Sequence, residues 1–388
     1  MIFSNTGRTL ALALLIFPLS LQALTTEAAL AAVPQLQATQ AWPVTAPLSA
    51  PGGLRPCCAF GYNLKAKLGF IPVPLYRVNN VVDTESLGHH AYNDSLLGAA
   101  RQIAGMSQEK NGILYTQRGG FIDIAHVRDT ADMTFYLFSQ LYPRLGKAFT
   151  LRLDDELAQR QIIFFPFAIP EDAAQAYTLA VWISAHIAFQ VAAWHEIAQW
   201  YGFRSVPGFS EEISAFSPED LYSNLLGARL SASLLLSGEG ASKGEFNAAL
   251  SKALPAALRQ LGAQPARLTR FQFDMLDGVW WCSKRAVPDK FLVLYRNYFV
   301  GNSRLPTSVP GERSPPVLLS LPASVAGLDL DKAGELRLFP SRHMKALPPP
   351  AQFYHWADFP TLAAFAHKSD DFTLSMMSKA GKGCTEAK

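Results

Sequence analysis

The sequence predicts an α+β fold: a predominantly helical single domain around a long buried central helix at about 171–201, with short β-hairpins beside it. Three observations support this prediction. Residues 171–201 are apolar on most faces, which is typical of a helix at the centre of a domain. Two β-rich runs flank the turn Arg118-Gly119-Gly120. The 388 residues are 49% hydrophobic and 17% charged, which is enough apolar material for a large core and excludes a disordered chain.

Caps and turn residues predict the other elements. Adjacent glycines favour the turns that join the strands of a hairpin. Ser, Asp or Thr before a helix accepts hydrogen bonds from its first N–H groups, and Pro fits its first turn. In chain order, the sequence predicts a helix over 95–105, strands over 113–117 and 121–127, a helix from Asp129 or Thr130 to about 142, a strand over 161–167, helices over 217–236 and 244–261 (the latter kinked or split at Pro255), two strands within 279–300 and a short helix over 362–367.

The central helix has well-marked ends. Pro170 precedes it, acids occupy its first turn and Gly202 follows it, which is the usual placement of these residues around a helix. A membrane span is the alternative for so apolar a stretch. Polar residues within the length of one span argue against it, because they are costly in lipid; they are His186, Gln190, His195 and Glu196.

The N-terminus has the layout of a secretory signal peptide. Arg8 precedes an apolar run over 10–24, and Ala29-Leu30-Ala31 fits the small-x-small pattern of a cleavage site. The run is too short for a bilayer span and contains Pro18, so no transmembrane anchor is expected after signal cleavage. We expect cleavage near Ala31 or Ala32 and a periplasmic or secreted mature protein.

Shifts in composition divide the chain into four parts. They are a signal peptide over 1–32, an extended Pro-, Ala- and Gln-rich leader over 33–56, a mixed α+β core domain over 57–300, and a Pro-rich C-terminal extension over 301–388 that packs on the core. The net charge is only +3, and the basic residues form no block. Because binding to nucleic acid relies on concentrated positive charge, no nucleic-acid partner is expected.

The four cysteines allow disulfides in an oxidising compartment, with three connectivities open. Cys57 and Cys58 are adjacent, and a bond between neighbours would close a strained ring, so each would pair with a distant cysteine. We expect one bridge from the Cys57/Cys58 pair to Cys282, with Cys384 as the less favoured partner.

The most specific motif is Trp194-His195-Glu196-Ile197-Ala198-Gln199-Trp200. It resembles the zinc-binding pattern His-Glu-x-x-His, with Gln199 in place of the second His. Residues four apart share a helix face, so His195 and Gln199 can point at one ion while Glu196 polarises a bound water. Neutral Gln is a poor zinc ligand, so another ligand is needed. Downstream acids that can supply it are Glu211, Glu212 and Glu219. The alternative is that His195 and Glu196 are hydrogen-bonded core residues.

Two further stretches contain candidate ligands. His126 lies where a β-rich run gives way to a helix, and Asp129 is near enough in sequence to orient its ring. The alternative is a capped helix start. His90 follows His89 in a turn. Because adjacent side chains diverge, only one of the two is expected to contribute, and His90 is preferred; the alternative here is a polar turn.

Several of these features together are similar to an uncharacterised family of exported bacterial proteins of unknown function. They are the export signal, the segment over 119–129 (GGFIDIAHVRD), the helix end Trp194-His195-Glu196 and the later Asp277-Gly278-Val279-Trp280-Trp281. The resemblance covers most of the mature chain and supports treating residues 57–300 as one unit. It implies no activity, substrate or site residue.

The function that these residues favour is an exported metal-dependent hydrolase of the zinc type, acting in the bacterial envelope. Its metal ligands would be His126, His195 and His90, and its catalytic general base Glu196; additional candidates are Asp129, Gln199, Glu212 and Glu219. Its cofactor would be zinc, and its substrate a small molecule, peptide, glycan or lipid. The alternative is a non-catalytic periplasmic binding or envelope-structural protein with an aromatic groove.

Overall fold

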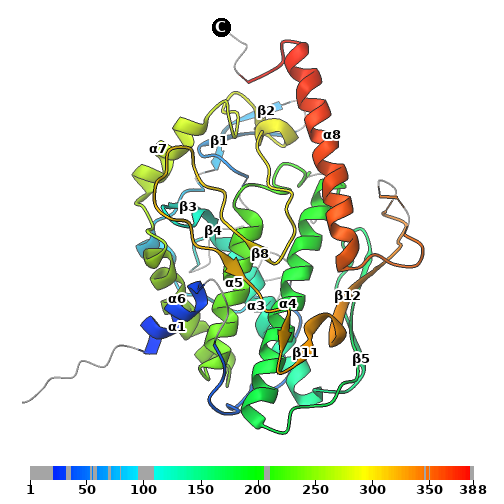
Figure 1. The fold of residues 1–388 in the computed structure, drawn as a ribbon. Helices are drawn as coiled ribbons and strands as arrows, with labels where there is room; N and C mark the ends of the chain where they lie inside the picture. The colour runs from blue at the N-terminus through cyan, green and yellow to red at the C-terminus, as the bar shows by residue number, and fades with distance from the viewer. Residues whose placement is uncertain are drawn as a thin grey trace, which may run out of the picture.

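The computed structural model describes residues 21–31, 36–52, 55, 59–68, 71–78, 80–94, 109–204, 210–344, 347–348 and 350–384. Helices dominate these residues, and most strands pair in short antiparallel sets, so the predicted α+β class is confirmed. Figure 1 shows the helices gathered at the centre, with small groups of strands around them.

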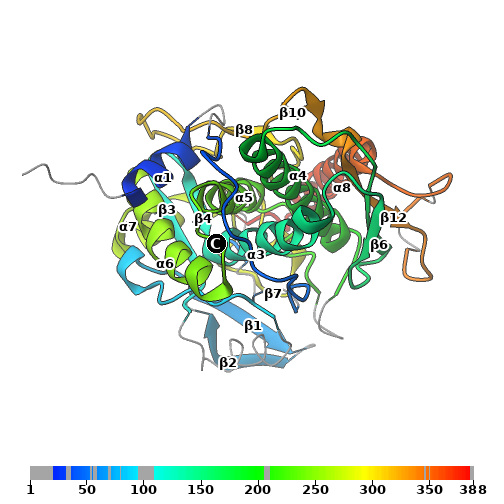
Figure 2. The same cartoon turned by 90° about the horizontal axis from the view of Figure 1, so that it is seen from below.

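Three helices form the centre: α3 (Ile124–Leu141), α4 (Ala173–Trp200) and α5 (Asp220–Leu236). Each contacts the other two, and Figure 2 shows them side by side. The outer helices are α1 (Leu21–Leu30) and α6 (Lys243–Gln260) against α5, α8 (Phe359–Lys379) against α4, and α7 (Ala266–Leu276) against strand β3.

The predicted central helix is α4. Beyond its first turn every residue except Ala192 is buried. The Asp172 side chain caps its N-terminus by accepting a hydrogen bond from the Gln175 N–H at 2.8 Å. Among the described residues, α4 is the one helix long and apolar enough to cross a membrane, yet 94% of its most apolar window is buried inside the protein. Such burial is typical of a core helix.

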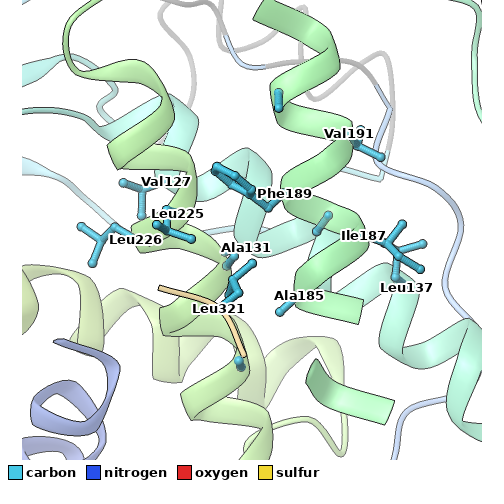
Figure 3. Packing of buried hydrophobic residues seen from close by; sticks show 14 of the residues in the cluster. Val127, Ala131, Leu137, Ala185, Ile187, Phe189, Val191, Leu225, Leu226 and Leu321 are labelled. Atoms are coloured by element: carbon cyan, nitrogen blue, oxygen red, sulfur yellow. The ribbon is translucent and has the colours of Figure 1, made fainter. Parts of the chain in front are cut away.

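Apolar side chains from all three central helices fill the space between them. Figure 3 shows part of this cluster, including Val127 of α3, Phe189 of α4 and Leu225 of α5. All three side chains are fully buried. Each large apolar side chain removed from water contributes about 1.5–3 kcal/mol. This packing fixes the positions of the helix ends.

Helices α3 and α5 cross in backbone contact at Gly227. A Cβ atom at this position would lie 2.1 Å from the carbonyl oxygen of Val127, far inside van der Waals contact. Only glycine therefore allows this approach. The crossing sets the distance between the N-terminal halves of the two helices.

The strands form small sheets around the helices. β3 (Ile113–Thr116) and β4 (Gly120–Asp123) are the predicted hairpin. β6 (Gln159–Phe164), predicted over 161–167, pairs with β5 (Phe149–Arg152) and with β12 (Gly334–Phe339). The remaining strands are β1 (Leu64–Leu68), β2 (Ile71–Val78), β7 (Ala286–Val287), β8 (Ser303–Arg304), β9 (Leu319–Ser320), β10 (Ser324–Val325) and β11 (Leu328–Asp329).

Strand β4 leads directly into α3 because Asp123 caps the helix. Its side chain accepts hydrogen bonds from the N–H groups of Ala125 at 2.7 Å and His126 at 3.4 Å. The prediction that Asp129 or Thr130 caps this helix is therefore wrong. His126 lies in the first helical turn and not at the end of a strand.

Other predicted elements differ from the observed ones. The helix predicted from residue 217 begins at Asp220, and α6 continues unbroken through Pro255. The only strand assigned within residues 279–300 is β7, and the two strands predicted there are reduced to an isolated antiparallel bridge between Trp281 and Val293. The short helix predicted over 362–367 is part of the longer α8. The helix predicted over 95–105, residues 1–20 of the expected signal peptide, and Cys57 and Cys58 lie outside the described residues.

Cys282 forms a disulfide with Cys384, so the expected bridge from the Cys57/Cys58 pair to Cys282 is wrong. The unpredicted length of α8 explains the difference. This helix carries the C-terminal tail to the loop that follows α7, as Figure 1 shows.

Gly227→Ala is expected to destabilise the protein by about 1–3 kcal/mol, the usual range for overpacking, because the methyl group would overlap the Val127 carbonyl. Chemical denaturation followed by circular dichroism measures this change. Gly244→Ala is the matched control, because the nearest atom to its added Cβ is 3.9 Å away and alanine favours the helix. Its stability should be unchanged or higher. Equal stability of Gly227→Ala and the wild type would contradict the close crossing.

Cys384→Ser is expected to lower the free energy of unfolding by about 2–4 kcal/mol, because the disulfide restricts the unfolded chain. Urea denaturation of the oxidised proteins measures the difference. The two proteins should become equally stable when a reductant is present throughout. A difference that survives reduction would show that the bridge is not its cause.

Candidate metal centre

Three buried side chains meet where the central helices end. His126 lies in the first turn of α3, Glu196 near the C-terminal end of α4, and Asp220 is the first residue of α5. One ligand atom of each lies within 4.8 Å of the other two. His126 Nδ1 is 3.7 Å from Glu196 Oε1, and His126 Nε2 is 3.7 Å from Asp220 Oδ1. Imidazole nitrogen and carboxylate oxygen are both ligands of divalent metal ions.

Backbone hydrogen bonds hold both carboxylates in place. Glu196 Oε2 accepts from the Phe216 N–H at 2.7 Å, and Asp220 Oδ2 from the Ser217 N–H at 2.8 Å. The other oxygens, Glu196 Oε1 and Asp220 Oδ1, are buried and receive no hydrogen bond from the described residues. A buried acceptor without a donor is costly, and a cation between these two oxygens would satisfy both.

Two more carboxyl groups lie close by. Both oxygens of Glu219 are buried, and no other described residue donates a hydrogen bond to them. Asp123, the cap of α3, is fully buried. Burial raises the pKa of Glu219, and the charges of Asp123 and Glu196 raise it further. Burial also raises the pKa of Asp220, with Glu196 and Glu219 adding to the effect. The group therefore favours taking up either protons or a cation.

Two buried arginines face this group, which we call the acid cluster: Asp123, Glu196, Glu219 and Asp220. Burial lowers the pKa of Arg296 and of Arg304, and the charges of Asp220 and Glu196 oppose that effect. Asp370 also contacts Arg296, but Lys290 lies 2.8 Å from Asp370 and balances it. With all four carboxyl groups ionised, the two guanidinium groups would leave two negative charges, which either one divalent ion or two protons would balance.

Neighbouring turns of α3 and α5 position the His126 ring. The Asn224 amide lies 3.0 Å from His126 Nδ1, and the Thr130 hydroxyl donates a hydrogen bond to Asn224 Oδ1 at 2.7 Å. Binding of an ion at His126 Nε2 requires a proton on Nδ1 and the Asn224 amide turned so that its oxygen accepts it. The Asn224 side-chain amide can rotate in this way because its oxygen and nitrogen ends have nearly the same size and shape.

A cavity of about 290 Å³ adjoins this group and is lined by His126. His195, Asp129, Thr130 and Asn224 also line it. From the sequence, His126 and His195 were predicted to be ligands of one metal ion. Both lie on this cavity, but only His126 belongs to the group of three ligand atoms.

His195 is paired with another acid. Its Nδ1 is 3.4 Å from Glu156 Oε2, and Glu156 Oε1 is 2.8 Å from Arg160. Burial alone would lower the pKa of His195, but the Glu156 carboxylate outweighs it and raises the pKa to about 9. His195 is therefore a protonated group on the cavity wall at neutral pH.

The other candidates from the sequence do not belong to the group of three ligand atoms. His90 is 2.9 Å from Asp132 and 3.2 Å from Glu109, and both acids bind the buried Arg55. Asp129 joins that network through Arg55 at 2.7 Å. Of the remaining candidates, Gln199 donates a 3.4 Å hydrogen bond to Glu211, Glu212 is half-buried near Gly202, and Glu219 belongs to the acid cluster.

Sequence analysis did not single out Asp220 and Asn224. An acid in the first turn of a helix is fully explained by the helix dipole, so Asp220 gave no separate signal. The spacing of Asp220 and Asn224 by four residues could have indicated a shared helix face. However, His126 on α3, which contacts both residues, is distant in sequence, and only the fold brings it close.

Glu156→Gln is expected to lower the pKa of His195 by about 1–3 units. Without the carboxylate that stabilises the protonated ring, the effect of burial, which favours the neutral ring, would dominate. NMR titration of the histidine ring signals measures this. Glu212→Gln is the control and should leave the pKa near 9. Since the folded pKa lies above the ordinary value, the pair stabilises the fold fully below about pH 6.5 and progressively less up to pH 9. A His195 pKa near its ordinary value in the wild type would contradict the pairing.

Residues 45–310 match the family described as "Protein of unknown function (DUF4056)". This range contains His126, Glu196 and Asp220. No curated protein and no solved structure matches the chain. The family match covers more than half of the chain, so the resemblance to an uncharacterised family is confirmed. The chain belongs to this family of unknown function.

Proposed function

We propose that the protein is a metal-dependent hydrolase in which His126, Glu196 and Asp220 hold a divalent ion at the wall of the cavity. The observation that supports this proposal is the location of His126. Its side chain belongs to the buried group of three ligands and also lines the cavity. An ion at this position would have protein ligands on one side and the cavity on the other. Catalytic metal sites keep such an open position, whereas structural sites are closed by protein ligands.

The donor set supports a divalent ion. One imidazole with carboxylates and no thiolate suits zinc, and it suits manganese or magnesium as well. Glu219 is the additional oxygen donor that the acid cluster offers, since both of its oxygens are buried and no other described residue donates a hydrogen bond to them. With all four carboxyl groups ionised, the cluster would exceed the charge of Arg296 and Arg304 by two, which matches the charge of one such ion.

The proposed chemistry changes the role of one residue. A divalent ion held here would polarise a carbonyl or phosphoryl oxygen and lower the pKa of a bound water. Glu196 would be a ligand of the ion and not the general base expected from the sequence. Asn224 and Thr130 hold the His126 ring and line the same cavity, so a substrate in the cavity would lie beside them.

The size of the cavity favours a small ligand. Its volume of about 290 Å³ lies at the low end of ligand pockets, which measure about 300–1,000 Å³. We infer a small molecule, or the end of a peptide, glycan or lipid chain, as substrate. We also propose that the protein acts in the bacterial envelope, on the basis of the export layout of its N-terminus.

His126→Ala and Asp220→Asn should each lower the affinity for divalent metal by at least about 100-fold, and Asn224→Leu by about 10–100-fold, because Asn224 only positions a ligand. Metal content by mass spectrometry and competition with a chromophoric chelator measure these changes. His186→Ala is the matched control, because His186 is also buried on α4 but contacts Asp331 and lies outside the group. Metal retained equally in all variants, or absent from the wild type, would contradict the proposal.

An assay of hydrolysis distinguishes a metal-dependent hydrolase from a non-catalytic binding protein. The purified wild type would be tested against ester, peptide and glycan substrates after removal of metal and after return of zinc, manganese or magnesium. Activity that requires both the added metal and His126 supports the hydrolase. Bound metal without activity toward any of these substrates would favour the non-catalytic binding protein.

A further inference from the structure

We propose that helix α1 remains in the mature protein, so that the export signal is cleaved upstream of Thr26 and not near Ala31 or Ala32. This proposal concerns the processing of the N-terminus. It rests on contacts of α1 and is independent of the metal centre.

The C-terminal half of α1 belongs to the packed interior. Thr26 and Ala29 are buried, with 0% and 1% of their surface exposed. Gln260 of α6 donates a hydrogen bond from Nε2 to Thr26 Oγ1 at 3.0 Å. The helix contacts both α5 and α6, and Figure 2 shows it beside them. If α1 were removed during export, water would have to fill the space that it occupies beside α5 and α6.

The strongest contact is made by Arg229 of α5, which is only 1% exposed. One of its terminal nitrogens donates to the carbonyl oxygens of Ala28 at 3.0 Å and Ala31 at 2.7 Å, and the other to Ser320 at 2.6 Å. No carboxylate within the described residues forms a salt bridge with it. Three backbone carbonyl groups therefore take the place of water around this buried cation. Two of them, those of Ala28 and Ala31, lie at the end of α1.

The contact satisfies both partners. The last carbonyl groups of a helix have no partner within the helix, and a cation near them is favourable. A buried guanidinium without acceptors is strongly unfavourable. Cleavage at Ala31 would remove two acceptors of Arg229 and uncover the surface of α5 and α6 that α1 covers. Ala23 is a small residue upstream of Thr26, and cleavage after it would spare these contacts.

The direct test is the mass of the mature protein. The full chain with its own N-terminus would be produced in a bacterial host, recovered from the periplasmic fraction and measured intact by mass spectrometry. A cleaved chain whose first residue lies at or before Thr26 supports the proposal. An uncleaved chain, or a first residue beyond Thr26, overturns it.

A double-mutant cycle tests the contact itself. Two forms of the chain would begin at Leu24 and at Val33, each with and without Arg229→Met. The Tm of the shorter form should be about 5 °C lower or more. Arg229→Met should lower the Tm of the longer form and should leave that of the shorter form unchanged or raise it, because the cation there has lost its acceptors. The same effect of Arg229→Met in both forms would overturn the proposal.

Discussion

The burial of four carboxyl groups at one point is the constraint on which the rest of this structure depends. Asp123, Glu196, Glu219 and Asp220 lie where α3, α4 and α5 end, and the buried Arg296 and Arg304 oppose their charge. Negative charges removed from water must take up protons or be balanced by cations. Because the imidazole of His126 lies among them and lines the cavity, the group could hold a divalent ion there.

A helix cap, backbone hydrogen bonds and one close helix crossing hold the residues of this group in place. Asp123 starts α3 one turn before His126, and backbone N–H groups fix one oxygen each of Glu196 and Asp220. The crossing at Gly227 brings α5 against α3, which places Asn224 on the His126 ring. Packing between the helices thus determines the geometry of the site, because the site residues belong to three helices joined by the core.

Local signals predicted the fold class, the β3–β4 hairpin and the central helix, because periodicity, caps and turn glycines act over a few residues. The start of α3 was missed because Asp123 and Asp129 both look like caps in the sequence. In the candidate site, His126 and Glu196 were predicted because of their residue types. Asp220, the role of Glu156 beside His195, and the Cys282–Cys384 bridge depend on contacts between distant segments, which no local pattern encodes.

The most direct measurement for the central claim is anomalous X-ray diffraction from crystals of the purified protein, recorded on either side of the absorption edge of the metal that mass spectrometry identifies. The account predicts an anomalous peak within bonding distance of His126, Glu196 and Asp220, about 2.0–2.2 Å for a transition metal. Clear density for these three side chains with no peak between them, in crystals soaked with that metal, would contradict it.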